Sequence, residues 1–418
     1  MPSYRVRPGG ALAGTVRVSG ATKNSGLKQM AAALLAPGVT TLRNMPSVVD
    51  LDVMVELLRA TGVTVERPGP DTVRVDASGE IVPEAPYELV TRMRASFNVL
   101  GPLVARCGRA RVALPGGDSI GSRKVDMHLR GLEAMGARVE VAHGFVETEA
   151  EVLHGARVVL DFPSVGATEN LMCAAVLAKG TTVIENAARE PEVTDLASFL
   201  NRMGAHVLGA GSSTVTIEGV EELSPTDNEV MADRIEAGTL LVACGIAGGE
   251  VELTGVRPEH LDPVVRQLCA MGMRISATAD GLWARSDGTL RAADLRTMPH
   301  PGFPTDLMPP TVAALAVAEG RSFVAENVYD GRFLFVDELA RMGADVMTED
   351  HYVIVSGVGR LSGAPVQASD VRAGAALVLA GLVAEGETVV HEGEHIDRGY
   401  PDLAGRLRAL GADVTRVP

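Results

Sequence analysis

Apolar side chains recur every three or four residues in several stretches of the chain, as they do along one face of an α-helix. Leu51, Met54, Val55 and Leu58 form one such stretch, which ends at Gly62. Glycine can adopt the positive φ that often terminates a helix. The next three residues are rich in β-branched side chains and predict a strand. The pattern therefore predicts an amphipathic helix that ends at a glycine and leads into a strand.

This pattern repeats six times along the chain. The glycines that end the amphipathic helices are residues 62, 136, 204, 272, 343 and 411, at separations of 74, 68, 68, 71 and 68 residues. A second set follows runs rich in Ala, Leu and Val, at residues 38, 108, 180, 249, 320 and 386, with separations of 70, 72, 69, 71 and 66. Six copies of a unit of about seventy residues therefore fill the chain.

Each unit predicts two helices and additional strands, so the fold class is α/β or α+β rather than a stack of helix pairs. The amphipathic helix of each unit is expected on the outside of a domain. The other helix is apolar nearly all round, as the segments 31–35, 174–177 and 377–384 show. Such a helix is expected to be buried at the centre of a domain.

The length of 418 residues suggests two domains, and six units divide naturally as three plus three. The boundary is expected in the polar segment between Val220 and Asp233. An apolar fraction of 46% with only 3% aromatic residues indicates cores built from small aliphatic side chains.

Charge and hydropathy exclude some classes of partner. The net charge of −15 argues against nucleic acid. No apolar run reaches the roughly 18 residues that a membrane span needs, and the N-terminus does not resemble a signal peptide. The four cysteines, at positions 107, 173, 244 and 269, have no paired spacing. We therefore expect a cytoplasmic protein with reduced thiols in its core.

One segment that departs from the repeat is the loop from Pro115 to Lys124. It holds three glycines together with Asp118, Arg123 and Lys124. Such a loop could close over an anion as a lid. The alternative is an ordinary surface loop with a solvated aspartate.

Two further departures precede expected buried helices. Lys23 lies near a helix start, where a cation is unfavourable, and could therefore serve to bind an anion. It could equally be a surface lysine whose stem packs on apolar neighbours. Asp306 follows a proline-rich segment that begins at Pro299, and it could be a catalytic carboxylate or a plain helix N-cap.

Arginines recur in several units, often beside an aspartate: Arg94, Arg234, Arg332, Arg372 and Arg398. If they converged on one cleft, they would suit a polyanionic substrate. Solvated ion pairs explain each of them equally well. No grouping of His, Cys and Asp has metal-ligand spacing, and no GxGxxG or GxxxxGK[ST] motif is present.

Taken together, ordered motifs along residues 4–417 resemble the UDP-N-acetylglucosamine enolpyruvyl transferase (1-carboxyvinyltransferase) family. The motifs are Gly20–Asn24, Arg94–Ser96, Leu114–Gly121 with Arg123 and Asp126–His128, Asp161–Thr168, Asn186–Glu192, Asp233–Glu236, Phe303–Asp306, Arg332-Phe333, Asp370–Ala373 and His395–Tyr400. The resemblance implies two inside-out α/β barrel-like domains, each made of three βαβαββ repeats. One domain would span 23–230 and carry the mobile lid 114–124, and the other would comprise 1–22 and 231–418.

The resemblance also implies the reaction. The family transfers the enolpyruvyl group of phosphoenolpyruvate to the 3′-hydroxyl of UDP-N-acetylglucosamine, releases phosphate, and proceeds by addition and elimination. This is the first committed step of peptidoglycan synthesis, on which cell wall biogenesis, cell shape and cell division depend. The implied enzyme is cytoplasmic, needs no cofactor or metal, and is a monomer or weak homo-oligomer.

Residue roles follow from the resemblance. Lys23, Arg123 and Arg398 would hold phosphoenolpyruvate, with Arg332, Asp370 and Arg372 nearby. Asn24 would bind the reacting sugar, and Asp306 would accept the proton of its 3′-hydroxyl. The remaining nucleotide-sugar contacts would come from Arg94, Lys124, Ser164, Val165, Gly166 and Val328. Closure of the two domains and of the lid would exclude water.

Asp118 is the main departure, because most members carry a cysteine there. That cysteine donates a proton and is the target of the epoxide fosfomycin. A carboxylic acid can also donate a proton if its pKa is raised in a closed anionic site. It is a weaker nucleophile than a thiolate. Some family members, notably actinobacterial ones, carry aspartate, so we expect an active, fosfomycin-insensitive enzyme.

Other departures keep a second acceptor open. Thr22 is an additional residue, Lys124 replaces a proline, Met308-Pro309-Pro310 replaces a segment that often contains glutamine, and Gly331 replaces Asn or Ala. A sister enzyme acting on a uridine nucleotide such as UMP, in nucleoside antibiotic synthesis, would share the catalytic core. The related 5-enolpyruvylshikimate-3-phosphate synthase is disfavoured because its Gly-Asn-Ala-Gly-Thr loop is absent. A paralogue without activity is disfavoured because Lys23, Asp306 and Arg398 are present.

Overall fold

The repeated glycines adopt the backbone conformation that their positions require. A computed structural model describes residues 2–20, 22–118, 120–121 and 123–418. All twelve glycines have φ between 70° and 120°, a region that side chains with a Cβ rarely enter. Gly62, for example, lies between α2 (Val49–Ala60) and β4 (Thr64–Gly69). The predicted alternation of helix, glycine and strand is confirmed.

Among the described residues, the strands form six four-stranded sheets, one for each repeat. Every sheet has the same pairing, with one parallel pair followed by two antiparallel pairs. In one of them β10 (Arg157–Val159) runs parallel to β11 (Thr181–Glu185), while β13 (Thr214–Glu218) pairs antiparallel with both β11 and β12 (His206–Leu208). Because helices precede and follow the second strand, each repeat is a βαβαββ unit, which confirms the expected fold class.

The chain divides into two compact units. The N-terminal unit comprises Gly20–Gly117 and Lys124–Met231, and the C-terminal unit comprises Met1–Ser19, Asp118–Arg123 and Ala232–Pro418. The segment Asp118–Arg123 thus groups with the C-terminal unit, although the residues on either side of it belong to the N-terminal unit. The domain boundaries inferred from the sequence stay a prediction.

The N-terminal unit contains three repeats. The first has β14 (Asp227–Glu229), α1 (Lys23–Ala32) extended by η1 (Ala33–Leu35), β3 (Val39–Arg43), α2, β4 and β5 (Thr72–Asp76). The second has β6 (Glu84–Ala85), α3 (Tyr87–Val90), η2 (Arg94–Val99), α4 (Leu100–Cys107), β7 (Arg109–Ala113), α5 (Asp126–Ala134), β8 (Arg138–Ala142) and β9 (Phe145–Glu149). The third has β10, α6 (Val165–Ala175), β11, α7 (Pro191–Arg202), β12 and β13.

The C-terminal unit also contains three repeats. The first has β2 (Leu12–Arg17), α8 (Arg234–Ala247), β15 (Gly249–Thr254), η3 (Pro258–Leu261), α9 (Asp262–Ala270), β16 (Arg274–Ala277) and β17 (Gly281–Ser286). The second has β18 (Leu295–Arg296), η4 (Thr305–Leu307), α10 (Met308–Leu315), β19 (Arg321–Ala325), α11 (Leu334–Arg341), β20 (Asp345–Glu349) and β21 (Tyr352–Ser356). The third has β22 (Pro365–Gln367), α12 (Val371–Gly381), β23 (Thr388–His391), α13 (Glu394–Asp397), α14 (Leu403–Ala409), β24 (Asp413–Val417) and β1 (Ser3–Arg7).

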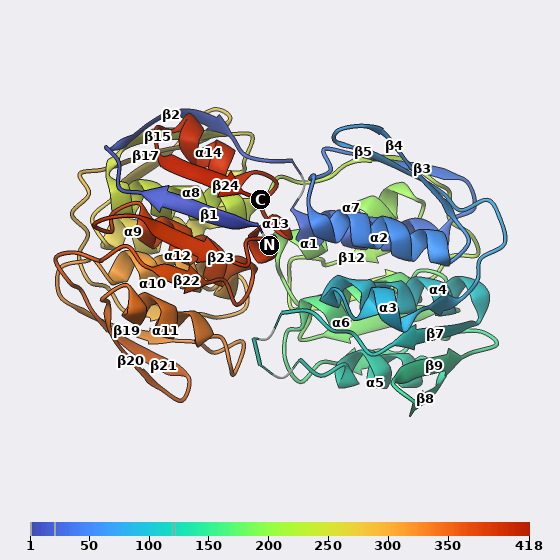
Figure 1. Ribbon diagram of the computed structural model, residues 1–418. Coiled ribbons are helices and arrows are strands. Elements are labelled where there is room, and N and C mark those ends of the chain that lie inside the picture. The colour runs from blue at the N-terminus through green and yellow to red at the C-terminus, as the bar shows by residue number, and fades with distance from the viewer. Residues whose placement is uncertain (1, 21, 119, 122) are drawn as a thin grey trace. The chain divides into compact units, whose positions relative to one another are not determined.

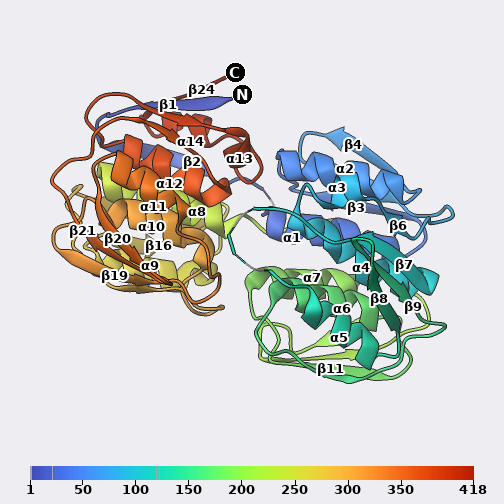
Figure 2. The same ribbon diagram turned by 60° about the horizontal axis from the view of Figure 1, so that its bottom comes forward.

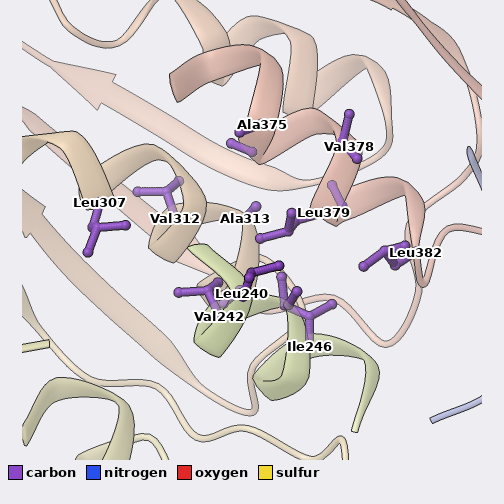
Figure 3. Packing of buried hydrophobic residues seen from close by; sticks show 14 of the residues in the cluster. Leu240, Val242, Ile246, Leu307, Val312, Ala313, Ala375, Val378, Leu379 and Leu382 are labelled. Carbon is purple, nitrogen blue, oxygen red and sulfur yellow. The ribbon is translucent and has the colours of Figure 1, made fainter. Parts of the chain in front are cut away.

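The apolar helix of each repeat lies at the centre of its unit. In the C-terminal unit, α8, α10 and α12 pack against one another and the strands lie around them (Figures 1 and 2). Figure 3 shows how Leu240, Val312 and Leu379 point from these three helices into a shared core. Every residue of α12 is buried. Helices therefore form the interior and sheets the periphery, which is the expected inside-out arrangement.

Strands from distant parts of the chain complete both units. β1 pairs antiparallel with β23 and β24, and β2 pairs parallel with β15, so the N-terminal residues belong to sheets of the C-terminal unit. Figure 1 shows blue β1 beside red β23 and β24. In the N-terminal unit, β14 supplies the parallel partner of β3.

The cysteines are all free thiols, but they are not all in the core. Cys173 and Cys244 are buried, Cys107 is half-buried and Cys269 is exposed. The expectation of four core thiols is therefore wrong for Cys269, because it lies on the solvent side of amphipathic α9. In the described part of the chain, no helix is long and apolar enough to cross a membrane.

Candidate functional site

The loop that follows β7 holds Asp118 against an arginine. Arg398 Nη1 donates a hydrogen bond to Asp118 Oδ1 at 2.5 Å, and both side chains are mostly buried. Arg123 Nη2 donates to the backbone carbonyl of Asp118 at 2.7 Å. Ser119 and Ser122 of this loop lie outside the described residues. The structure thus brings together Asp118, Arg123 and Arg398, three of the residues selected from the sequence.

Close backbone packing connects this loop to the segment before Arg332. A Cβ atom at Gly121 would lie only 2.8 Å from the Gly331 nitrogen, and φ of Gly121 is 106°. A Cβ at Gly331 would in turn lie 3.2 Å from the Gly121 Cα. Gly331, which differs from the residues usual in the family, is therefore explained by the loop that packs on it.

Asp306 lies between two buried arginines. Arg332 Nη2 is 2.9 Å from Asp306 Oδ1, and Arg372 Nη2 is 3.2 Å from Asp306 Oδ2. The N-cap interpretation of Asp306 is wrong, because Asp306 lies within η4 and Leu307 is the N-cap residue of α10. The arginine contacts instead favour the ionised carboxylate at a fixed position.

Both arginines remain charged and have unused donors. Burial would lower the pKa of Arg332 and of Arg372, but neighbouring groups outweigh it, mainly Asp306 and Asp370 for Arg332, and Tyr400 and Asp306 for Arg372. The net effect raises both pKa values. Arg332 Nε and Arg372 Nη1 are buried and have no hydrogen-bond partner among the described residues. Such donors are costly to leave unpaired, so this cluster is suited to receive an anion.

Residues that the sequence interpretation missed orient these groups. Thr305 Oγ1 accepts a hydrogen bond from Arg332 Nη1 and donates one to Glu326 Oε2, both at 2.8 Å. Glu326 Oε1 accepts from the backbone nitrogen of Val328 at 2.8 Å. Glu326 is buried directly after apolar β19, and a carboxylate at that point of a strand was the signal available in the sequence.

Asp370 supports the cluster through the backbone. It is the N-cap residue of α12, where its Oδ1 accepts from the backbone nitrogens of Arg372 at 2.8 Å and Ala373 at 3.1 Å. This cap fixes the start of the helix from which the Arg372 side chain projects. Asp370 is therefore placed to orient Arg372. Arg234, another of the recurring arginines, is buried at the start of α8.

In the N-terminal unit, Lys23 and Asn24 form the first turn of α1. Thr22 is the N-cap residue and its Oγ1 accepts from the Asn24 nitrogen at 3.3 Å, which gives this additional residue a structural role. Lys23 Nζ is 2.9 Å from Asp50 Oδ2, so a carboxylate of α2 offsets the unfavourable position of the lysine. Ala21 lies outside the described residues.

The predicted nucleotide-sugar residues of this unit lie at two further helix starts. Arg94 is the first residue of η2, and its Nη2 donates to the Lys124 carbonyl at 3.1 Å. Ser164 is the N-cap residue of α6 and accepts from the Ala167 nitrogen at 3.3 Å, so Val165 and Gly166 begin that helix. A helix start of this kind presents backbone donors to an anion.

His128 lies in the same region and is buried beside Asn170, whose Nδ2 is 2.9 Å from His128 Nδ1. Burial, and secondarily the charge of Arg94, lowers the pKa of His128 to about 3. The imidazole is therefore neutral at physiological pH. Within the described residues, no group of three or more His, Cys, Asp or Glu side chains could hold a metal ion.

Comparison with known proteins extends over nearly the whole chain. Residues 6–407 match the family model of EPSP synthase (3-phosphoshikimate 1-carboxyvinyltransferase). The UDP-N-acetylglucosamine 1-carboxyvinyltransferase of Corynebacterium jeikeium is 51% identical over 415 residues and covers 99% of each chain. The enzyme of the same name from Myxococcus xanthus is 50% identical over 418 residues, with 100% of this chain and 99% of the relative covered.

Solved structures agree with this relationship. The enolpyruvyl transferase NikO from Streptomyces tendae is 30% identical, has a TM-score of 0.89, and covers 100% of this chain and 99% of its own. EPSP synthase from Acinetobacter baumannii is 20% identical with a TM-score of 0.77 over both full chains, which establishes a shared fold. The chain therefore belongs to the EPSP synthase family and, within it, to the UDP-N-acetylglucosamine 1-carboxyvinyltransferases.

Proposed function

We propose that this enzyme transfers the enolpyruvyl group of phosphoenolpyruvate to the 3′-hydroxyl of UDP-N-acetylglucosamine and releases phosphate. The geometric observation that carries the proposal is the carboxylate of Asp306 held between Arg332 and Arg372. One buried donor of each arginine, Arg332 Nε and Arg372 Nη1, has no partner among the described residues. An anionic donor substrate needs such guanidinium groups, and a sugar hydroxyl needs such a carboxylate. Relatives of the same length and about half-identical sequence carry this activity in their names.

Phosphoenolpyruvate would be held by its phosphate and carboxylate groups. We assign Arg398, Arg123, Lys23, Arg332 and Arg372 to these anions, because guanidinium and ammonium groups match them in charge and hydrogen-bonding capacity. Substrate anions would compete with Asp118 and Asp306 for their arginines. Binding would thereby free both carboxylates for proton transfer.

In the addition step, Asp306 would take the proton of the 3′-hydroxyl as that oxygen bonds to C2 of phosphoenolpyruvate. Protonated Asp118 would give its proton to C3, so that C2 and C3 become a saturated tetrahedral ketal. In the elimination step, C3 would return a proton to the Asp118 carboxylate, the C2–O bond to phosphate would break, and the double bond would re-form. The departing phosphate would take up the proton held by Asp306, so that both carboxyl groups return to their starting states. The arginines would stabilise the charges that develop.

The acceptor would be bound mainly by the other residues selected from the sequence. We assign Asn24 to the reacting sugar, and Arg94, Lys124 and the Ser164–Gly166 helix start to the nucleotide diphosphate, with Val328 at the sugar. Arginine and a helix start are both suited to phosphate groups. We further propose a monomer or weak homo-oligomer that works in the cytoplasm.

Phosphate release by the purified protein tests this function. We expect release with phosphoenolpyruvate and UDP-N-acetylglucosamine together, and none when either is omitted. A parallel reaction with UMP tests the second acceptor. Release with UMP and none with the nucleotide sugar would replace the proposed acceptor, and release with neither would contradict the proposed function.

A further inference from the structure

Helix α1 carries more positive charge than a helix start favours. It begins at Lys23, has no acidic residue in its first turn, and has a second lysine, Lys28, one turn further on. Each lysine has a carboxylate partner on another helix. Asp50 of α2 pairs with Lys23, and Glu169 of α6 pairs with Lys28, whose Nζ is 3.1 Å from Glu169 Oε2. The Lys28–Glu169 pair is buried within the N-terminal unit.

This buried pair has two further hydrogen bonds. Lys28 Nζ donates to the backbone carbonyl of Asn24 at 2.6 Å, one turn back along α1. Glu169 Oε2 also accepts from Asn98 Nδ2 at 3.3 Å. One carboxylate oxygen thus connects side chains from α1, α6 and η2.

The three connected segments carry residues that we assign to the acceptor substrate. Asn24 lies in the first turn of α1, where its carbonyl receives the Lys28 hydrogen bond. Arg94 begins η2, four residues before Asn98. The Ser164–Gly166 segment begins α6, one turn before Glu169. The Lys28–Glu169–Asn98 network therefore joins the three segments whose first residues we assign to the acceptor site.

Stability alone does not account for the network. A buried ion pair can often be replaced by apolar side chains of similar volume without loss of stability, because its desolvation is costly. Glu169 Oε1 is also buried and has no hydrogen-bond partner among the described residues, which is a further cost. A role in function gives a physical reason for keeping these groups in the core.

We infer that Lys28 and Glu169 are positioning residues that hold the first turns of α1 and α6 in the arrangement that binds the nucleotide sugar. This inference rests on the proposed function. The two residues act through Asn24, Asn98 and the start of α6. Of the groups assigned to phosphoenolpyruvate, Lys23 lies on α1, but the four arginines belong to the C-terminal unit, so donor binding depends on the pair less than acceptor binding does.

The test is a double-mutant cycle with Lys28→Met, Glu169→Gln and both changes together. Steady-state kinetics would give KM for each substrate, and thermal unfolding would give Tm. We expect the Lys28→Met and double variants to raise KM for UDP-N-acetylglucosamine about tenfold, while KM for phosphoenolpyruvate changes less than about twofold. Adding Glu169→Gln to Lys28→Met should not increase the effect further, because the two residues act as one unit.

Val215→Ala is the matched control for loss of stability. Val215 is buried in β13 of the same unit and takes no part in the network. It should lower Tm and leave both KM values unchanged. If Lys28→Met changed both KM values equally, or lowered Tm and changed neither KM, the inference would be overturned.

Hydrogen exchange provides a readout that needs no substrate. In Lys28→Met, the amides of residues 27–29 in α1 should exchange at least several-fold faster than in the wild type, and in Val215→Ala they should not. If the wild type uses neither acceptor, the proposed function fails. In that case the positioning role is judged by hydrogen exchange alone, and unchanged exchange in Lys28→Met would overturn it. If the wild type is active and exchange is unchanged, only the positioning role fails.

Discussion

At the scale of single residues, the two candidate acid–base groups are both carboxylates held by arginines. Asp118 contacts Arg398, and Asp306 contacts Arg332 and Arg372. The arginine partners fix the direction of both carboxyl groups. The sequence motifs identified both aspartates, but the side chain that each one contacts is known only from the structure.

Asp118 should make the enzyme insensitive to fosfomycin. A carboxylate attacks an epoxide far more slowly than a thiolate does, so the wild type should retain activity after prolonged incubation with the inhibitor. Asp118→Cys should create time-dependent inactivation with an added inhibitor mass on that residue, measured by mass spectrometry. Asp118→Ser, which offers neither group, is the control. Rapid inactivation of the wild type with an adduct on Asp118 would refute this expectation.

Asp306→Asn should lower kcat by about 10²–10⁴-fold, as expected when a general base is removed. KM for phosphoenolpyruvate should not rise, because Arg332 and Arg372 lose a carboxylate that competes with the substrate anions. Initial rates of phosphate release at varied phosphoenolpyruvate concentration give kcat and KM. A variant with wild-type kcat would remove Asp306 from the proton-transfer step.

The stability of the protein should depend on a second kind of carboxylate, one that is buried away from the arginine clusters. Glu236 of α8 accepts a hydrogen bond from the Ser19 nitrogen at 3.0 Å and lies 3.4 Å from Arg406 Nε. Burial raises the pKa of Glu236 to about 7, assisted by the charge of Asp233 and opposed by Ser19 and Arg406.

The raised pKa of Glu236 makes the protein more stable at low pH than at high pH. The folded state binds the proton more tightly than the unfolded state, so this contribution is fully present below about pH 4.5 and is lost as pH rises through about 7. Glu236→Gln should remove a pH-dependent contribution of roughly 2–3 kcal/mol over that window. Thermal unfolding at pH 5 and pH 8 measures it. If the difference in Tm between pH 5 and pH 8 were the same in Glu236→Gln as in the wild type, the raised pKa of Glu236 would be refuted.

At the scale of helices and strands, a repeat glycine can be compared with Gly219, a glycine outside the repeat pattern. Gly204 follows α7 with φ of 103°, and a Cβ there would meet no atom within 4 Å. Gly204→Ala should therefore cost only the backbone strain, about 1–2 kcal/mol. A Cβ at Gly219 would lie 1.6 Å from the Ala178 carbonyl oxygen, so Gly219→Ala should cost considerably more. Denaturant unfolding would rank the two, and the reverse order would contradict the steric account.

Local sequence patterns predicted the helices and strands well, because these elements depend mainly on residues that are neighbours along the chain. The twelve glycines, the amphipathic helices such as α2, and the apolar central helices all follow from periodicity and backbone freedom. Asp306 was open to an N-cap interpretation because its arginine partners lie 26 and 66 residues further along the chain. The pairing of β14 with β3 is likewise set by packing between distant segments, which periodicity does not record.

At the scale of the whole molecule, each unit has its own core and its own three sheets. A fragment of residues 20–231 should therefore fold cooperatively by itself, as its strands pair with one another. A fragment of residues 232–418 should not, because it lacks β1, which lies between β23 and β24 in one sheet, and β2, the edge strand that covers β15 in another. Circular dichroism and hydrogen exchange of the two fragments provide the measurement.

Adding a peptide of residues 2–19 to the second fragment should restore its structure, and a scrambled peptide of the same composition is the control. Independent, stable folding of 232–418 without the peptide would show that β1 and β2 are dispensable. Failure of 20–231 to fold would show that the N-terminal unit depends on the rest of the chain.

The placement of β1 also fixes an order of events during synthesis. Tyr4 pairs with Val390 and with Arg416, so both partners of this strand are synthesised several hundred residues after it. At about 5–20 residues per second, roughly 20–80 seconds separate the two. During that interval the N-terminal unit can form, while the backbone groups of β1 stay without their strand partners. The sheet that contains β1 can therefore form only after β23 and β24 have been synthesised.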